Sequence, residues 1–125
     1  FFITEGSAPY DWLTPQDDNL WQGVSGINNP CPTGYRLPTD AEWDAERQSW
    51  SSNDAAGAFA SPLKLPVAGH RYFSNGSLDF VGSLGGYWSS TVDGTDSGYL
   101  YFSSGFASIY SNYRANGRSV RCLKD

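Results

Sequence analysis

Methionine is absent from this sequence, and histidine occurs only once, at His70. His70 has no evident serine or cysteine partner, so nothing suggests the base and nucleophile of a catalytic triad. Basic residues are also scarce: 8 Lys and Arg stand against 13 Asp and Glu, giving a formal net charge of −5. Since binding to nucleic acid needs a positive field, this balance argues against nucleic acid as a partner. No apolar run reaches the roughly 18 residues of a membrane helix, so we expect no membrane insertion.

Aromatic residues and glycine are abundant where charge is not. Charged residues make up 17% of the chain, aromatic residues make up 16%, and glycine occurs 14 times. This mixture is typical of a rigid, loop-rich extracellular domain. The length of 125 residues predicts a single domain over 1–125. The chain opens on Phe1-Phe-Ile3, which we interpret as a short internal strand, so we expect a mature fragment or a module of a longer exported protein.

Only two cysteines occur, Cys31 and Cys122. They form either one disulfide or two buried free thiols. Cys31 lies between Pro30 and Pro32 in a loop, which is a poor place for a core thiol, so we favour the disulfide. It would close a loop of about 92 residues, for which chain-entropy arguments give about 4–5 kcal/mol of stabilisation. A disulfide would also imply export, to the cell surface or beyond.

Local signals predict two helices. Thr39 and Glu42 have the spacing of a capping box, and Trp43 and Trp50 follow as the apolar side of a helix from Thr39 to about Trp50. Asn53 or Asp54 can cap a second, short helix through Ala55–Phe59.

The rest of the chain favours β structure. Asn75-Gly76 predicts a hairpin between 70–73 and 78–81. Strands are predicted at 86–90, 99–102, 106–111 and, closing the sheet, at 119–123. Helices followed by a glycine- and serine-rich meander indicate an α+β fold.

Three blocks of sequence carry a family resemblance. They are Pro15-Gln-Asp-Asp-Asn-Leu-Trp-Gln-Gly23, Asn28-Asn-Pro-Cys-Pro-Thr-Gly-Tyr-Arg-Leu-Pro-Thr39, and the pair Tyr87-Trp-Ser-Ser-Thr91 with Arg118-Ser-Val-Arg-Cys122. In this order they resemble the Fibrobacter succinogenes major paralogous domain. Gly34–Trp43 is also similar to the RLPTEAEW segment of formylglycine-generating-enzyme-like domains. The resemblance implies a C-type-lectin-like fold, with a main helix and a short one packed on a small, mostly antiparallel sheet. Fold alone does not give function.

The enzymatic branch of that group uses a pair of reactive, copper-binding cysteines near its C-terminus. The stretch that would carry them here, 108–116, contains no cysteine. Cys122 falls instead at a position that looks structural in the resemblance. We therefore expect no enzymatic activity. The alternative, a related oxidase, would require free thiols that take up copper.

Acidic loop residues raise the question of calcium. Asp17, Asp18 and Asn19 form one cluster of hard oxygen ligands, and Asp93 and Asp96 lie in a second. No EF-hand spacing is present, and such residues often serve as turn formers. Calcium therefore stays open as an assisting ion, and no cofactor is firmly indicated.

A ligand-binding face is the positive hypothesis. Tyr, Ser and Asn residues alternate along the last strands, and these are the residues that binding surfaces favour. Packing of the same residues between layers explains the pattern equally well, so both interpretations stay open. The candidate ligand residues are Trp88, Asp93, Asp96, Tyr99, Tyr101, Ser103, Ser108, Tyr110, Asn112, Tyr113, Arg114 and Asn116. Arg36, Arg118 and Arg121 are interpreted as structural.

These observations predict a non-catalytic recognition or adhesion module that binds a glycan or an exposed peptide. The alternative is a structural subunit of a surface fibre or stalk. In that case exposed strands such as Phe1-Phe-Ile3 would pair with another copy or with a neighbouring domain.

Overall fold

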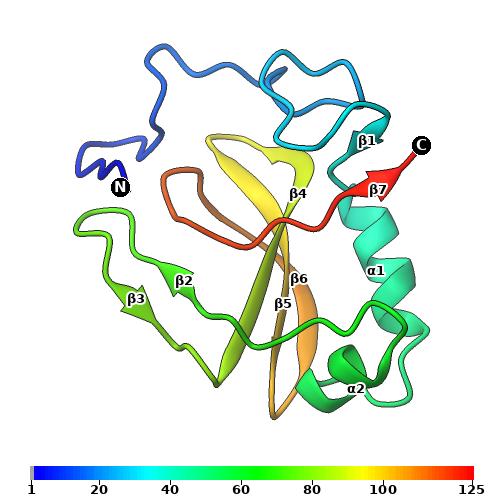
Figure 1. Cartoon of the computed structure of the whole chain (residues 1–125). Helices are drawn as coiled ribbons and strands as arrows, with labels where there is room; N and C mark the ends of the chain where they lie inside the picture. Colours follow the sequence, from blue (N-terminus) through cyan, green and yellow to red (C-terminus); the bar gives the residue numbers. More distant parts are fainter. Residues whose placement is uncertain (1) are drawn as a thin grey trace.

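Both helices begin at the residues whose side chains cap them (Figure 1). In the computed structural model, which describes residues 2–125, α1 spans Asp40–Gln48. The Thr39 hydroxyl accepts from the Glu42 amide, and the Glu42 carboxylate accepts from the Thr39 amide, so the predicted capping box is confirmed. The second helix, α2, spans Ala55–Ala60. Of its two predicted caps, Asp54 is the one that accepts from the amide of Gly57.

The main sheet has three antiparallel strands joined in chain order. They are β4 (Leu84–Asp93), β5 (Asp96–Ser103) and β6 (Ala107–Tyr113). The strands predicted at 86–90, 99–102 and 106–111 are confirmed, and each is part of, or overlaps, a longer element. A β-bulge interrupts the pairing of β4 with β5 between Trp88 and Val92. Two helices with antiparallel sheets make the chain an α+β protein, as predicted.

Two smaller sheets complete the fold. β2 (His70–Arg71) pairs with β3 (Leu78–Asp79), so the predicted hairpin is confirmed, although its strands are short. Its loop is wider than a two-residue turn, because the Tyr72 amide donates to the Ser77 carbonyl. β1 (Tyr35–Arg36) pairs with β7 (Leu123–Lys124) at the far end of the chain.

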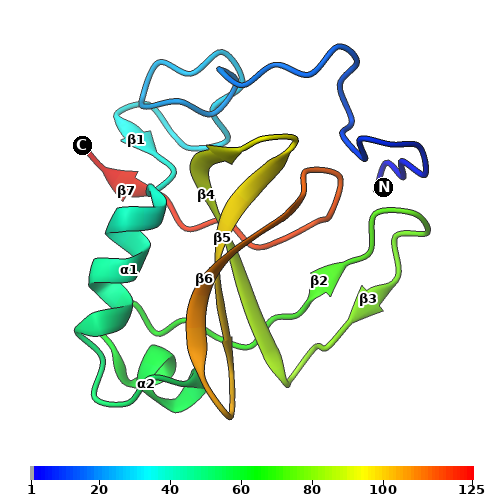
Figure 2. The ribbon, with the colours of Figure 1, turned by 180° about the vertical axis from the view of Figure 1, so that it is seen from behind.

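The core lies between the helices and one face of the main sheet. α1 and α2 lie on one side of the sheet, and the β2–β3 hairpin lies on the other (Figures 1 and 2). Trp43 and Trp50 pack in one buried cluster with Leu100 and Phe102 of β5. The Trp43 indole N–H donates to the Trp88 carbonyl at 3.1 Å, which ties α1 to β4. This packing leaves the opposite face of the sheet to form the surface described below.

The strand predicted at 119–123 does not pair as we expected. Residues 119–123 do not close the main sheet as an antiparallel strand. Ser119 makes a single parallel bridge to Tyr87, and the chain then leaves to pair with β1 through Leu123 and Lys124. The alternating pattern of this segment does not specify which neighbour it meets.

The predicted strand Phe1-Phe-Ile3 begins outside the described residues, because Phe1 is not among them. Over Phe2 and Ile3 the prediction is wrong, since the backbone there is irregular. The Phe2 ring packs edge-on against Trp12 at 5.8 Å between ring centroids, and it lies against Gly76 and Gly117. Phe2 thus packs against its own chain.

Cys31 and Cys122 form the predicted disulfide, across 91 positions of sequence. It joins the loop before β1 to the segment before β7, and so reinforces the pairing of those two strands. Over residues 2–125, neither helix has the length and apolar character needed to cross a bilayer.

Candidate functional site

The face of the main sheet opposite α1 carries the predicted ligand residues. In the register of β5 and β6, Tyr99 lies opposite Tyr110 and Tyr101 lies opposite Ser108. Because side chains alternate along a strand, these four share one face, while Leu100 and Phe102 point to the core. We call this surface the β-face and define it by Trp88, Tyr99, Tyr101, Ser108, Tyr110 and Asn112.

Burial divides the predicted residues into two groups. Trp88, Tyr99 and Asn116 are 2%, 7% and 3% exposed. These three side chains are therefore largely packed against their neighbours, and their role as ligand residues stays a prediction. Tyr110 and Tyr113 are exposed, as is Asp93, whereas the rest are partly buried: Asp96, Tyr101, Ser103, Ser108, Asn112 and Arg114.

One end of the β-face is an aromatic surface. The Tyr101 ring lies 5.2 Å from Phe106 and 5.7 Å from Tyr110, measured between ring centroids. Phe106 is 43% exposed and Tyr110 is 46% exposed, so these rings present area to solvent. We call Tyr101, Phe106 and Tyr110 the aromatic platform. Its third member, Phe106, stands in the β5–β6 turn and was not among the predicted site residues.

Elsewhere the β-face is hollowed, where β2 and the residues just after it lie against Tyr99. A cavity of about 320 Å³ opens there, and we call it the Arg118 pocket. Its walls are formed by His70, Tyr72, Phe73, Leu84, Tyr99, Asn112, Tyr113, Asn116 and Arg118. Four of these, Tyr99, Asn112, Tyr113 and Asn116, are predicted site residues, which the fold does bring together.

Hydrogen bonds hold the polar wall of this pocket in place. The side-chain oxygen Oδ1 of Asn116 accepts from the Phe73 backbone amide, and Asn116 Nδ2 donates to Asn112 Oδ1. Burial, followed by the nearby Arg118 charge, lowers the pKa of His70 below its usual value. The imidazole is therefore neutral at pH 7, and its buried Nδ1 has no hydrogen-bond partner among the described residues. The pocket thus holds polar groups with unused capacity.

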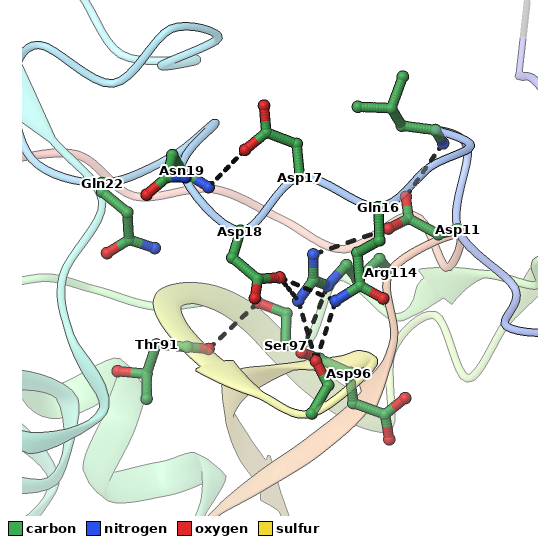
Figure 3. A network of polar contacts seen from close by, with 12 residues as sticks. Asp11, Gln16, Asp17, Asp18, Asn19, Gln22, Thr91, Asp96, Ser97 and Arg114 are labelled. Atoms are coloured by element: carbon green, nitrogen blue, oxygen red, sulfur yellow. Dashed lines mark hydrogen bonds and ion pairs between the residues drawn. The ribbon is translucent and has the colours of Figure 1, made fainter.

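Arg114, which follows β6, holds the acidic loop that carries Asp11, Asp17 and Asp18 against the sheet (Figure 3). Arg114 Nη2 donates to Asp18 Oδ1 at 2.7 Å, and Asp11 lies 3.7 Å from Arg114 Nη1. Gln16 donates to the same Asp18 oxygen, and these two hydrogen bonds lower the pKa of Asp18. Asp17 accepts from the Asn19 amide, which is an ordinary turn contact.

Of the predicted calcium ligands, Asp17 and Asp18 each accept hydrogen bonds from protein donors through one carboxylate oxygen. Residues 2–125 contain no group of three His, Cys, Asp or Glu placed to hold a metal ion. Asp93 accepts from the Ser111 hydroxyl. Burial, and then the charge of Asp93, raises the pKa of Asp96. Arg114, predicted as a ligand residue, serves this loop tie instead of the β-face.

A second, larger cavity of about 450 Å³ lies beside that tie. Its walls combine apolar side chains, such as Trp12, Leu13 and Ile27 of the loop before β1, with polar and acidic residues of the same loop. Its one arginine, Arg114, is already paired with two carboxylates. The β-face is the better candidate site because it combines exposed rings with polar groups that lack partners.

Three comparisons with known proteins give one match. The family model described as Domain of unknown function (DUF8237) matches residues 44–123, which is more than half of the chain. Neither the curated proteins nor the solved structures give a match. The matched span contains the aromatic platform and every wall residue of the Arg118 pocket, whereas the loop carrying Asp11, Asp17 and Asp18 lies outside it.

Arg118, which the sequence analysis interpreted as structural, lies in the wall of this pocket. A signal was present in the sequence. From Ser97 to Lys124 the chain has no Asp or Glu, although Arg114, Arg118 and Arg121 all fall there. An arginine in such a stretch must find its carboxylate far along the chain or do without one.

Proposed function

Because the chain belongs to the DUF8237 family, whose function is unknown, we propose its function from geometry: a non-catalytic recognition module that binds a glycan on its β-face. The observation that carries the proposal is the aromatic platform beside a pocket on one sheet face. Exposed rings offer flat apolar area, and the neighbouring amides and hydroxyls supply adaptable hydrogen bonds. A sugar has apolar C–H faces and a rim of hydroxyls, so this combination suits it.

Two further proposals concern the fold of the domain and where it acts. We propose that the fold is C-type-lectin-like, which is supported by two helices on one side of an antiparallel sheet and by the joining of β1 to β7. We also propose that the domain acts outside the cytoplasm, at a cell surface. The disulfide supports this, because such bonds persist mainly in oxidising compartments.

The proposed binding does not depend on calcium. This is supported by the pairing of Asp18 Oδ1 with Arg114, by the turn contact of Asp17 Oδ1, and by the lack, within residues 2–125, of any group of three His, Cys, Asp or Glu placed for a metal ion. Assembly into a fibre through the first residues is not favoured either. Phe2 already contacts Trp12, Gly76 and Gly117 of its own chain.

An array screen of the purified domain tests the proposal. Glycans and peptides would be printed together, and the screen run once with calcium and once with a chelator. We expect glycan hits that persist in the chelator. Hits confined to peptides, or no hits in either condition, would overturn the assignment.

Variants then locate the site. Tyr101→Ala with Tyr110→Ala should weaken binding to an array hit by roughly tenfold or more, as expected for loss of a central aromatic contact. Tyr35→Ala is the matched control, since Tyr35 is also an exposed tyrosine on a strand but belongs to β1. If Tyr35→Ala lost as much affinity as the double variant at Tyr101 and Tyr110, the binding site would have to lie elsewhere.

A further inference from the structure

Arg118 is held against the β-face by aromatic rings. Its guanidinium carbon lies 3.7 Å from the centre of the Tyr99 ring and 5.3 Å from that of Trp88. Gly86 makes room for it, because a Cβ on that residue would lie 2.8 Å from Arg118 Nη1. A planar guanidinium stacked in this way keeps its N–H edge free to bind a ligand.

The charge of Arg118 has no carboxylate partner. Arg36 pairs with Glu42 and Asp125, Arg47 pairs with Asp44, and Arg114 pairs with Asp11 and Asp18. Within residues 2–125, Arg118 makes no ion pair and no side-chain hydrogen bond, and its Nε is buried without a partner. Burial lowers the pKa of Arg118, although arginine stays protonated at neutral pH.

A partly buried cation without a counter-charge is unfavourable, and cation–π contact offsets only part of the lost hydration. Acidic residues outnumber basic ones in this protein, whose formal net charge is −5, yet within residues 2–125 none of them pairs with Arg118. The groups that share its pocket are uncharged at pH 7: a neutral His70 and the amides of Asn112 and Asn116. The natural complement of this arrangement is an anion that enters from solution.

The single positive charge of Arg118 is best matched by a ligand group that carries a single negative charge. A carboxylate carries a single charge and accepts two parallel N–H bonds from a guanidinium, whereas a phosphate monoester carries about −1.5 to −2 at pH 7 and would be left partly unpaired. The pocket volume of about 320 Å³ is at the small end of ligand sites, which suits a group the size of one sugar. The ring centroid of Tyr99, in the pocket wall, lies 6.4 Å from that of Tyr110, so the pocket adjoins the aromatic platform.

We infer that the Arg118 pocket binds the carboxylate of an acidic sugar, with Arg118 as its ion-pairing residue and the aromatic platform supporting the adjoining sugar. This inference rests on the proposed glycan function and names the class of glycan. Asn112 and His70 complete the site as hydrogen-bonding neighbours of the carboxylate. The ligand is thus selected by charge at one end of the β-face and by stacking at the other.

The direct test is an NMR titration that follows the Arg118 Nε–Hε resonance of the whole domain. The probes are glucuronate, glucose, and N-acetylglycine as a mimic of a peptide carboxyl end. We expect glucuronate to shift the resonance at millimolar concentration, glucose to leave it unchanged, and N-acetylglycine to bind more weakly than glucuronate. A response to glucose equal to that of glucuronate would overturn the inference, as would tighter binding of N-acetylglycine or no shift with any probe.

Variants supply the second arm. Arg118→Gln should weaken glucuronate binding by roughly 10- to 100-fold, the range for loss of a charged hydrogen bond. Arg121→Gln is the control and should not change it, because Arg121 is an exposed arginine of the same acid-free stretch that does not line the pocket. Thermal unfolding would confirm that the variants fold. If Arg118→Gln does not fold, Arg118→Lys keeps the charge but loses the two-point contact, and it too should bind glucuronate more weakly. Unchanged affinity in a folded Arg118 variant would contradict the inference.

The two proposals fail in different ways. If array hits depend on Tyr101 and Tyr110 but acidic and neutral glycans bind alike, the glycan function stands and the carboxylate inference falls. If no glycan binds the array, the function itself falls, and the titration still reports whether the pocket takes a carboxylate.

Discussion

Glu42 stabilises the start of α1 through two neighbours. Its carboxylate accepts from Arg36 Nη1 and Nη2 at 2.8 and 2.7 Å, and from the Thr39 amide at 2.8 Å. The hydrogen bonds from Arg36, helped by the Thr39 amide, lower the pKa of Glu42 from 4.5 to about 2. Because the folded state holds this carboxylate ionised, protonation must work against folding.

This pKa predicts an acid-dependent loss of stability. The contribution of Glu42 is fully present above about pH 4.5 and is lost as the pH falls towards about 2, because the unfolded chain binds the proton first. We expect the stability difference between wild type and Glu42→Gln, from urea unfolding, to shrink over that range. A difference that stays constant with pH would contradict the assignment.

A second residue-scale prediction concerns close packing at Gly85. A Cβ there would run into the Phe102 ring, which is fully buried, stacks on Tyr87 and meets Trp50 edge to face. Since that ring cannot move aside, Gly85→Ala should lower the free energy of unfolding by about 1–3 kcal/mol. Gly105→Ala is the control, because the nearest atom to its Cβ is 4.0 Å away. Urea unfolding of both variants decides whether the ring is as fixed as we describe.

Among the elements, the helices could be predicted because their signals are local. Thr39 with Glu42 and Asp54 with Gly57 lie within one turn of each other, so the caps can be located from the sequence. The partner of residues 119–123 could not be predicted, because Ser119 meets Tyr87 and Leu123 meets Arg36 from far along the chain. Alternation specifies faces, and only the tertiary fold specifies neighbours.

The same limit applies to the site. Alternation correctly placed Tyr99 and Tyr101 on one face, as the register confirms. It did not indicate that the β2–β3 hairpin and Arg118 cover Tyr99 while Tyr101 stays near solvent. Burial of Trp88 and Asn116 likewise depends on segments distant in sequence.

The cap of α1 yields an element-scale prediction. Thr39→Ala removes the side-chain acceptor of the Glu42 amide and should lower the free energy of unfolding by about 1 kcal/mol. Thr39→Ser keeps the hydroxyl and should lose little. Comparable losses in the two variants would show that the Thr39 methyl group, rather than its hydroxyl, matters to the helix.

For the molecule as a whole, the disulfide is the main long-range constraint. It links Cys31 and Cys122 across 91 positions and so closes most of the chain into a loop. Cys31→Ser with Cys122→Ser should lower the free energy of unfolding by about 3–5 kcal/mol, because the unfolded chain regains the freedom that closure removes. Urea unfolding of the double variant and of the reduced wild type should agree. A loss below about 1 kcal/mol would mean that the unfolded chain is already compact.

The same bond has a mechanical consequence. If the chain is pulled from its two ends, the load passes from the first residues to Cys31, across the disulfide to Cys122, and out through β7. Residues 32–121, which include the whole β-face and the Arg118 pocket, then carry no tension. Only the loop before Cys31 and the few residues after Cys122 can be drawn out. A domain built in this way keeps its β-face intact while it is stretched.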